Sequence, residues 1–196
     1  MAEVVLFHHV QGLTDGMHAF AEELRAGGHT VHTPDIFDGE RPATVDDGVA
    51  HVRSIGDELL GERAARAVAD LPEELVYAGF SWGAGVAQEF AQTRTGARGA
   101  LLYESCMPIT GEWAFGPWPD GVPVQIHGMD KDPFFALGGD IDAARELVET
   151  VGSELAELFV YPGDRHLFAD TSLPSYDAEA AALVVQRSRD FLDRVG

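Results

Sequence analysis

Short apolar segments rich in strand-forming residues alternate with helix-length segments along almost the whole chain. The expected strands are residues 4–7, 29–33, 74–78, 100–103, 122–127 and 158–161. The expected helical segments are residues 16–26, 45–69, 84–91, 141–151 and 176–195. Strands separated by helices pair in parallel, and the helices cover both faces of the sheet. We therefore expect an α/β fold with a mainly parallel, twisted sheet. The 196 residues contain no repeat or linker, so we expect one domain, residues 1–196.

The sequence GFSWG, with Ser81 at its centre, is the motif that indicates chemistry. The pattern G-x-S-x-G is short and common, so its context decides its weight. An expected strand leads into it and an expected helix leads away. This is the context of a nucleophile elbow, in which small residues around the serine allow a strained turn that holds the hydroxyl above the sheet. We expect Ser81 to be the nucleophile of an α/β-hydrolase.

Two further residues complete a catalytic triad in the chain order that α/β-hydrolases use. The acid is Asp132, in the segment HGMDKDPF, and the base is His166, in the segment GDRHLF. Both follow expected strand ends, which is the edge of a parallel sheet where ligands bind. Asp130 is an alternative acid. We favour Asp132 because Asp-Pro-Phe begins the segment that follows the strand.

Backbone N–H groups are expected to stabilise the oxyanion of the reaction. One would come from Trp82 and the other from Val10, in the loop that follows the first strand. The neighbouring His8 and His9 could suggest a metal site. Adjacent residues at a strand end point to opposite faces, so they cannot easily share one ion. We expect neither a metal nor a cofactor.

Four residues are candidates for the substrate pocket: His9, Glu104, Trp113 and Asp170. Glu104 follows an expected strand end, and Trp113 lies among glycines and prolines in an expected loop that either caps an apolar pocket or covers the sheet edge. Cys106 has no elbow around it, so we expect a buried apolar group rather than a nucleophile.

The charge balance restricts the partners. The chain has 13 basic and 33 acidic residues and a formal net charge of −20. Such a surface repels nucleic acid and anionic lipid. No apolar run approaches the length of about 20 residues that a membrane span needs. The single cysteine and the lack of a signal peptide favour the cytoplasm. The scarcity of lysine fits either a GC-rich genome or adaptation to salt.

The chain resembles the dienelactone hydrolase family of α/β-hydrolases. The likeness spans nearly the whole chain and rests on four segments. They are the first strand with its following loop, a second unit similar to the family's "L-x-x-x-G-Y-x-V-x-x-P-D", the acid segment and the "H-x-F" histidine: residues 4–13, 24–35, 127–134 and 166–168. The resemblance implies the α/β-hydrolase fold and assigns the acid to Asp132 and the base to His166.

Three positions depart from the family pattern. Ser81 stands where the best-known members have cysteine, which favours ordinary esterase chemistry. His9 stands where they have a glutamate in the oxyanion loop. Asp170 stands where they have an arginine that binds the substrate carboxylate, so the resemblance does not extend to a dienelactone substrate. We expect Asp170 near the mouth of the pocket, where its charge would disfavour anionic substrates.

These observations together predict a hydrolase that cleaves small carboxylic esters or lactones through an acyl-enzyme, with neutral, short acyl groups preferred. Two alternatives stay open. An acyltransferase or perhydrolase would use the same triad with another acceptor in place of water, and a catalytically silent relative would only bind a ligand. The sequence indicates no oligomeric state.

Overall fold

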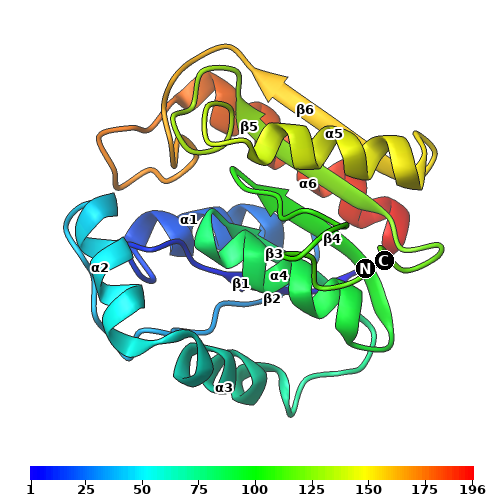
Figure 1. The fold of residues 1–196 in the computed structure, drawn as a ribbon, viewed down its shortest axis with the longest axis horizontal. Helices are drawn as coiled ribbons and strands as arrows, with labels where there is room; N and C mark the ends of the chain where they lie inside the picture. Colours follow the sequence, from blue (N-terminus) through cyan, green and yellow to red (C-terminus); the bar gives the residue numbers. More distant parts are fainter.

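The computed structural model describes residues 1–196, and its strands form one six-stranded sheet in which all neighbouring strands run parallel (Figure 1). The strand order is β2-β1-β3-β4-β5-β6. The strands are β1 (Glu3–Phe7), β2 (Thr30–His32), β3 (Leu75–Phe80), β4 (Ala97–Tyr103), β5 (Val124–Met129) and β6 (Ala156–Tyr161). The expected parallel α/β architecture is confirmed. All residues of β3 are buried, as a central parallel strand requires.

Five helices lie between strands and one follows the last strand: α1 (Asp15–Ala26), α2 (Val45–Ile55), α3 (Asp57–Val68), α4 (Trp82–Thr93), α5 (Asp140–Val151) and, after β6, α6 (Ala178–Val195). Three of them begin at a side chain that accepts a hydrogen bond from the backbone: Thr14 before α1, Thr44 before α2 and Asp177 before α6. The expected helical segment 45–69 is divided at Gly56. The φ angle of this glycine is 88°, which a helix does not allow.

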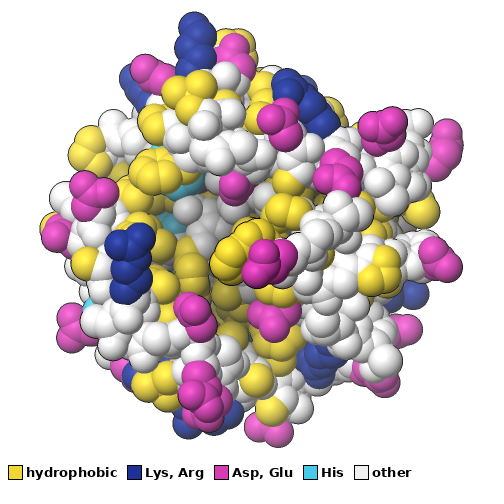
Figure 2. All heavy atoms as spheres, in the orientation of Figure 1, with side chains coloured by type: hydrophobic (Ala, Val, Ile, Leu, Met, Phe, Trp, Pro, Cys, Tyr) yellow, Lys and Arg dark blue, Asp and Glu magenta, His cyan; other side chains and the backbone are white.

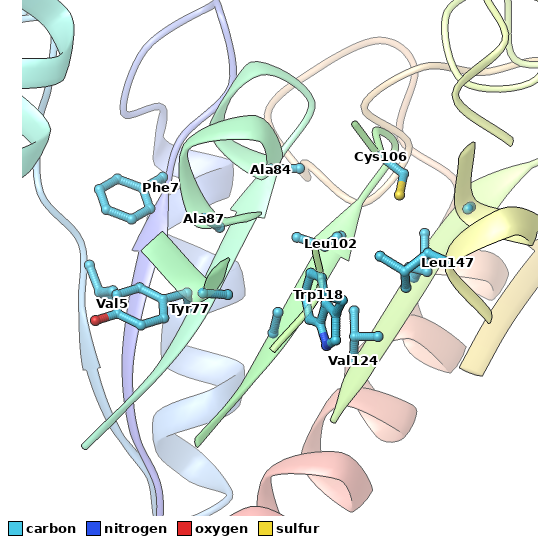
Figure 3. Packing of buried hydrophobic residues seen from close by; sticks show 14 of the residues in the cluster. Val5, Phe7, Tyr77, Ala84, Ala87, Leu102, Cys106, Trp118, Val124 and Leu147 are labelled. Atoms are coloured by element: carbon cyan, nitrogen blue, oxygen red, sulfur yellow. The ribbon is translucent and has the colours of Figure 1, made fainter. Parts of the chain in front are cut away.

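The sheet has a hydrophobic cluster on each face. On one face, α3, α4 and α5 pack against the sheet, and Figure 3 shows Phe7, Tyr77, Leu102 and Leu147 among the side chains that meet there. On the other face, α1 and α6 cover the sheet through a second cluster (Figure 1). None of the helices is both long enough and apolar enough to span a bilayer.

Glycines at both ends of the GFSWG motif allow the start of α4 to lie directly against the sheet. A Cβ atom added to Gly79 would lie 2.0 Å from the carbonyl oxygen of Gly83. A Cβ atom added to Gly83 would lie 2.4 Å from the carbonyl oxygen of His8. Neither backbone can move away without displacing a central strand, so both positions require glycine.

We predict opposite effects of alanine at two helical glycines. Gly83→Ala should lower the free energy of unfolding by about 1–3 kcal/mol or more, because the new methyl group meets backbone atoms. Gly61→Ala, in α3, should raise it by up to about 1 kcal/mol, because no atom lies within 4 Å of the new methyl group and alanine favours the helix. Urea unfolding of both variants measures these changes. Equal stability of the two variants would contradict the packing described for the elbow.

Candidate active site

Ser81 occupies a strained turn between β3 and α4. Its φ and ψ angles are 51° and −116°, a combination that few residues other than glycine adopt. The turn is held from β4, since the backbone N–H of Ser81 donates to the carbonyl oxygen of Tyr103 at 2.7 Å. The hydroxyl therefore stands at the carboxyl edge of the sheet and at the N-terminus of α4. No acidic residue lies in the first turn of this helix to offset its positive end.

Ser81, His166 and Asp132 lie in one hydrogen-bonded row, although they come from three different strand ends. The Ser81 hydroxyl is 2.8 Å from Nε2 of His166, and Nδ1 of His166 is 2.8 Å from Oδ2 of Asp132. Asp132 is fully buried. Its other oxygen, Oδ1, accepts the backbone N–H groups of Phe134 and Phe135 at 2.8 and 3.2 Å. These bonds aim Oδ2 at the histidine.

Asp130 has a different set of contacts. Its side chain is at the surface and Oδ1 accepts the backbone N–H of Gly163 at 2.9 Å. This bond ties the loop after β5 to the loop that carries His166. The carboxylate that faces His166 is that of Asp132.

Three carboxyl groups act on the ionisation of His166. Burial by itself lowers the pKa of this imidazole, because the low-dielectric surroundings disfavour the charged ring. The hydrogen bond to Asp132 and the negative charges of Glu104, Asp132 and Asp140 act in the opposite direction. The hydrogen bond and the three charges together outweigh the effect of burial, so the pKa of His166 is raised above its ordinary value.

Glu104 is a buried carboxyl group behind the loop of the histidine. It follows β4, and both it and Leu167 have a φ angle of 61°. Its Oε1 accepts the backbone N–H of Phe168 at 2.8 Å, while Oε2 is buried and has no hydrogen-bond partner within the protein. Burial raises the pKa of Glu104 to about 7. Glu104 therefore does not line an open pocket, but it braces the loop that carries the histidine.

The loop after β1 is held on several sides. Nδ1 of His8 lies 2.8 Å from the carbonyl oxygen of His9, and Nε2 of His8 accepts the backbone N–H of Ile36 at 3.0 Å. Burial lowers the pKa of His8 to about 4, so the ring is neutral. The side-chain amide of Gln11 donates to the carbonyl oxygen of Ala43 at 2.9 Å. No group of three or more His, Cys, Asp or Glu side chains is arranged to hold a metal ion.

Val10 and Trp82 present the backbone N–H groups expected in the oxyanion hole. Neither group donates to an acceptor within the protein. Val10 is fixed by α2, because the helix lies so near that a Cβ atom on Gly48 would be 2.3 Å from the Val10 carbonyl oxygen. Gly48 is a contributor that no motif marks, although a glycine inside a helix does suggest a close approach.

The expectation that Asp170 lies at the mouth of the pocket is wrong. Asp170 is 1% exposed, and its Oδ2 lies 2.9 Å from Nε2 of the equally buried His9. Thr14 also donates to Oδ2, and the hydroxyl of Ser172 donates to Oδ1 at 2.6 Å. Burial alone would raise the pKa of Asp170, but these hydrogen bonds outweigh it and lower the pKa to about 2.

His9 is likewise part of this network and does not line the pocket. The backbone N–H of Gln11 donates to Nδ1 of His9 at 3.2 Å, which leaves Nε2 to carry the proton toward Asp170. The His9–Asp170 pair thus links the loop after β1 to the loop after His166. Thr14 and Ser172 complete the pair, and no sequence motif marks either of them.

The aromatic residues after β4 have separate environments. Trp113 is 74% exposed and is not among the residues that line the cavity beside Ser81, so the expected pocket role of Trp113 is not supported. Phe115 does line that cavity, and Trp118 is buried in the core, where its indole N–H donates to the carbonyl oxygen of Val122 at 2.8 Å. Cys106 is buried in the same core cluster, and burial raises the pKa of its thiol.

A cavity of about 600 Å³ opens beside Ser81, between α3 and α4, with Met107 and Phe115 from the segment after β4. Figure 2 shows hydrophobic side chains lining a hollow on the face that carries α3, α4 and α5, with acidic side chains around it. None of the residues that line the cavity is basic. Another cavity, of about 430 Å³, lies between α1 and α6 and includes none of Ser81, His166 and Asp132.

The parallel sheet, the serine at a strained strand-to-helix turn and the chain order serine, acid, histidine define the α/β-hydrolase fold. Known structures with this fold resemble the chain at low sequence identity. A Klebsiella pneumoniae protein assigned as a dienelactone hydrolase is 17% identical, with a TM-score of 0.76 over 99% of this chain and 87% of that one. A dienelactone hydrolase-like promiscuous phosphotriesterase from metagenomic libraries is 16% identical, with a TM-score of 0.75 over 100% and 87%.

Esterase 2 of Thermogutta terrifontis, in a structure phosphorylated by paraoxon, is 17% identical, with a TM-score of 0.63 over 100% of this chain and 83% of that one. No curated protein matches the chain in sequence. The sequence model of the dienelactone hydrolase family matches residues 1–196. The chain belongs to this family, which confirms the resemblance inferred from its motifs and places it among ester-hydrolysing enzymes.

The ionisation of His166 predicts the pH dependence of turnover. The expected role of His166 as general base requires a neutral ring, so kcat/KM for an ester should rise with pH, with a midpoint above the ordinary histidine value of about 6.5. Glu104→Gln removes one of the negative charges that raise this pKa, so its midpoint should lie at lower pH. Glu154 lies just before β6, at the amino ends of the strands and far from His166, so Glu154→Gln should not move the midpoint. A midpoint that stays in place in a folded Glu104→Gln variant would contradict the electrostatic coupling.

Proposed function

We propose that this protein is a serine hydrolase that cleaves small carboxylic esters or lactones through an acyl-enzyme. The observation that carries this proposal is the continuous row of hydrogen bonds from Ser81 through His166 to Asp132. A serine hydroxyl is a poor nucleophile at neutral pH and needs a base within hydrogen-bond reach. Membership of the dienelactone hydrolase family supports the same class of reaction.

In the proposed reaction, the Ser81 oxygen attacks the ester carbonyl while Nε2 of His166 accepts the hydroxyl proton. Asp132 holds the Nδ1–H tautomer of the ring and stabilises the imidazolium that forms. The imidazolium then gives its proton to the leaving alcohol. Water attacks the acyl-enzyme with His166 again acting as base, which releases the acid and restores Ser81.

The negative oxygen that forms in each step would be stabilised by the N–H groups of Trp82 and Val10. Both groups are free of acceptors within the protein, and the N-terminal end of α4 adds a favourable electrostatic potential. The Val10 loop is held by contacts of four residues: His8, His9, Gln11 and Gly48. These contacts would keep the Val10 donor in place before substrate arrives.

An acyltransferase or perhydrolase would use the same residues up to the acyl-enzyme and differ only in the acceptor. Product analysis in water separates these activities from hydrolysis. A silent relative that only binds a ligand is disfavoured by the histidine, whose Nε2 lies within hydrogen-bond reach of the serine and whose Nδ1 faces a buried carboxylate.

Modification of the nucleophile provides the first test. Paraoxon should phosphorylate Ser81 alone, because no other serine has a histidine base at hydrogen-bond distance in this site. Ser81→Ala should lower kcat for an ester by about 10³-fold or more and leave the fold intact. Mass spectrometry of the labelled protein and turnover of p-nitrophenyl acetate measure both effects. Full turnover by a clean Ser81→Ala preparation would remove Ser81 from this role.

The two aspartates after β5 provide a matched pair. Asp132→Asn should lower kcat by about 10⁴-fold, because an amide favours the wrong tautomer of His166. Asp130→Asn should have little effect, because the amide oxygen can still accept the N–H of Gly163. If instead Asp130→Asn abolishes turnover and Asp132→Asn does not, the assignment of the acid is wrong.

A further inference from the structure

The cavity beside Ser81 is an elongated groove between two helices. Its α3 wall consists of residues spaced as one helical face: Asp57, Leu60, Gly61, Ala64 and Ala65. Its α4 wall follows the same period: Trp82, Gly85, Val86, Glu89 and Phe90. At 1.5 Å per residue, each wall is about 12 Å long. The groove therefore extends well beyond the volume that a short acyl group would fill.

Two glycines make the groove empty along its length. A Cβ atom on Gly61 would meet no other atom within 4 Å, and a Cβ atom on Gly85 would meet only the Met107 side chain, at 3.8 Å. Both backbones could thus carry larger side chains without a clash. The space is therefore left by small residues of both helices that line it.

The position of His166 decides which part of an ester would occupy the groove. The leaving alcohol must lie next to Nε2 of His166, which gives it a proton. The groove is lined by Ser81 and Trp82 but not by His166. Its lining includes Trp82, whose backbone N–H is an expected oxyanion donor, and four further residues of α4, so we infer that the groove receives the acyl group.

The lining also selects by polarity and charge. Leu60, Val86, Phe90 and Met107 present hydrocarbon, and the charged residues are both acidic, Asp57 and Glu89. Asp57 is explained by its place in the first turn of α3, where negative charge is favourable. Glu89 has no such explanation, because it lies in the C-terminal half of α4. An acyl chain that ends in a carboxylate would approach these charges and find no basic partner.

We propose that this groove is the acyl-binding site and that the substrates are esters of uncharged, medium-chain acyl groups. This inference rests on the proposed ester hydrolysis and adds the substrate class to it. It replaces the expectation of short acyl groups, and it transfers the discrimination against anions from Asp170 to Glu89 and Asp57.

A chain-length series tests the groove. The ratio of kcat/KM for p-nitrophenyl octanoate to that for p-nitrophenyl acetate should be about tenfold or more, since each buried methylene contributes up to about fourfold. Gly61→Phe fills the groove and should lower this ratio by about tenfold. Glu62→Phe places the same ring at the neighbouring exposed position of α3, outside the groove, and should leave the ratio unchanged. Equal ratios in the wild type and in Gly61→Phe would overturn the proposal.

The charge selection is tested with the p-nitrophenyl monoester of suberic acid, which has the same chain length as octanoate but ends in a carboxylate. Its kcat/KM should be about tenfold or more below that of the octanoate ester. Glu89→Lys should reduce this difference in kcat/KM between the two esters. Lysine suits this end of α4, so the variant should fold. A preference for the suberate monoester in the wild type would overturn the charge selection.

A binding measurement separates failure of the groove from failure of the proposed function. Calorimetric titration of 2-decanone into Ser81→Ala should show binding that Gly61→Phe, in the same background, weakens by about tenfold. Binding without any ester turnover in the wild type would retain the groove and reject ester hydrolysis. Turnover of the acetate ester by Ser81, with no binding of 2-decanone and no chain-length effect, would retain the hydrolase and reject the groove.

Discussion

The strained turn at Ser81 is the constraint on which the rest of the site depends. A residue other than glycine with a φ angle of 51° costs about 1–3 kcal/mol, and only close packing maintains it. That packing is the contact of Gly83 with the backbone of Phe7 and His8, together with the bond from the Ser81 N–H to Tyr103. The same contacts place the start of α4 beside the loop after β1. One set of backbone contacts therefore positions the Ser81 hydroxyl and the N–H of Trp82 next to this loop.

Buried polar groups then join the loops of the sheet edge to each other. The His9–Asp170 pair links the first loop to the loop after the histidine, and Asp130 links that loop to the one after β5. Nearly every polar atom in these links has a partner, as the low-dielectric interior requires. Glu104 is the exception, with one buried oxygen unpaired. It is also the group beside the histidine whose ionisation changes near neutral pH.

The sequence contained enough to predict the fold, the family and the three residues that the structure brings together. Strand and helix patterns are local, and parallel strands bring their ends to one edge, so Ser81, Asp132 and His166 could be placed together without coordinates. The direction of a side chain in a loop is not local. Asp170 and His9 were expected to face the pocket but point inward to each other, because Thr14 and Ser172 supply the partners that make burial favourable. The groove likewise depends on Gly61 and Gly85, which line it from separate helices, and no short pattern reveals this.

Replacing cysteine by serine at the elbow, with Cys106 enclosed in the core, also affects the chemistry to which the protein is exposed. Oxidants and alkylating agents attack thiolates, and the only thiol here is 1% exposed with a raised pKa. The residue at the elbow is Ser81, whose hydroxyl oxygen peroxide does not convert to a sulfenic acid. The proposed serine nucleophile would therefore survive oxidising conditions that inactivate a cysteine at the same position, and it would need no reducing partner to restore it.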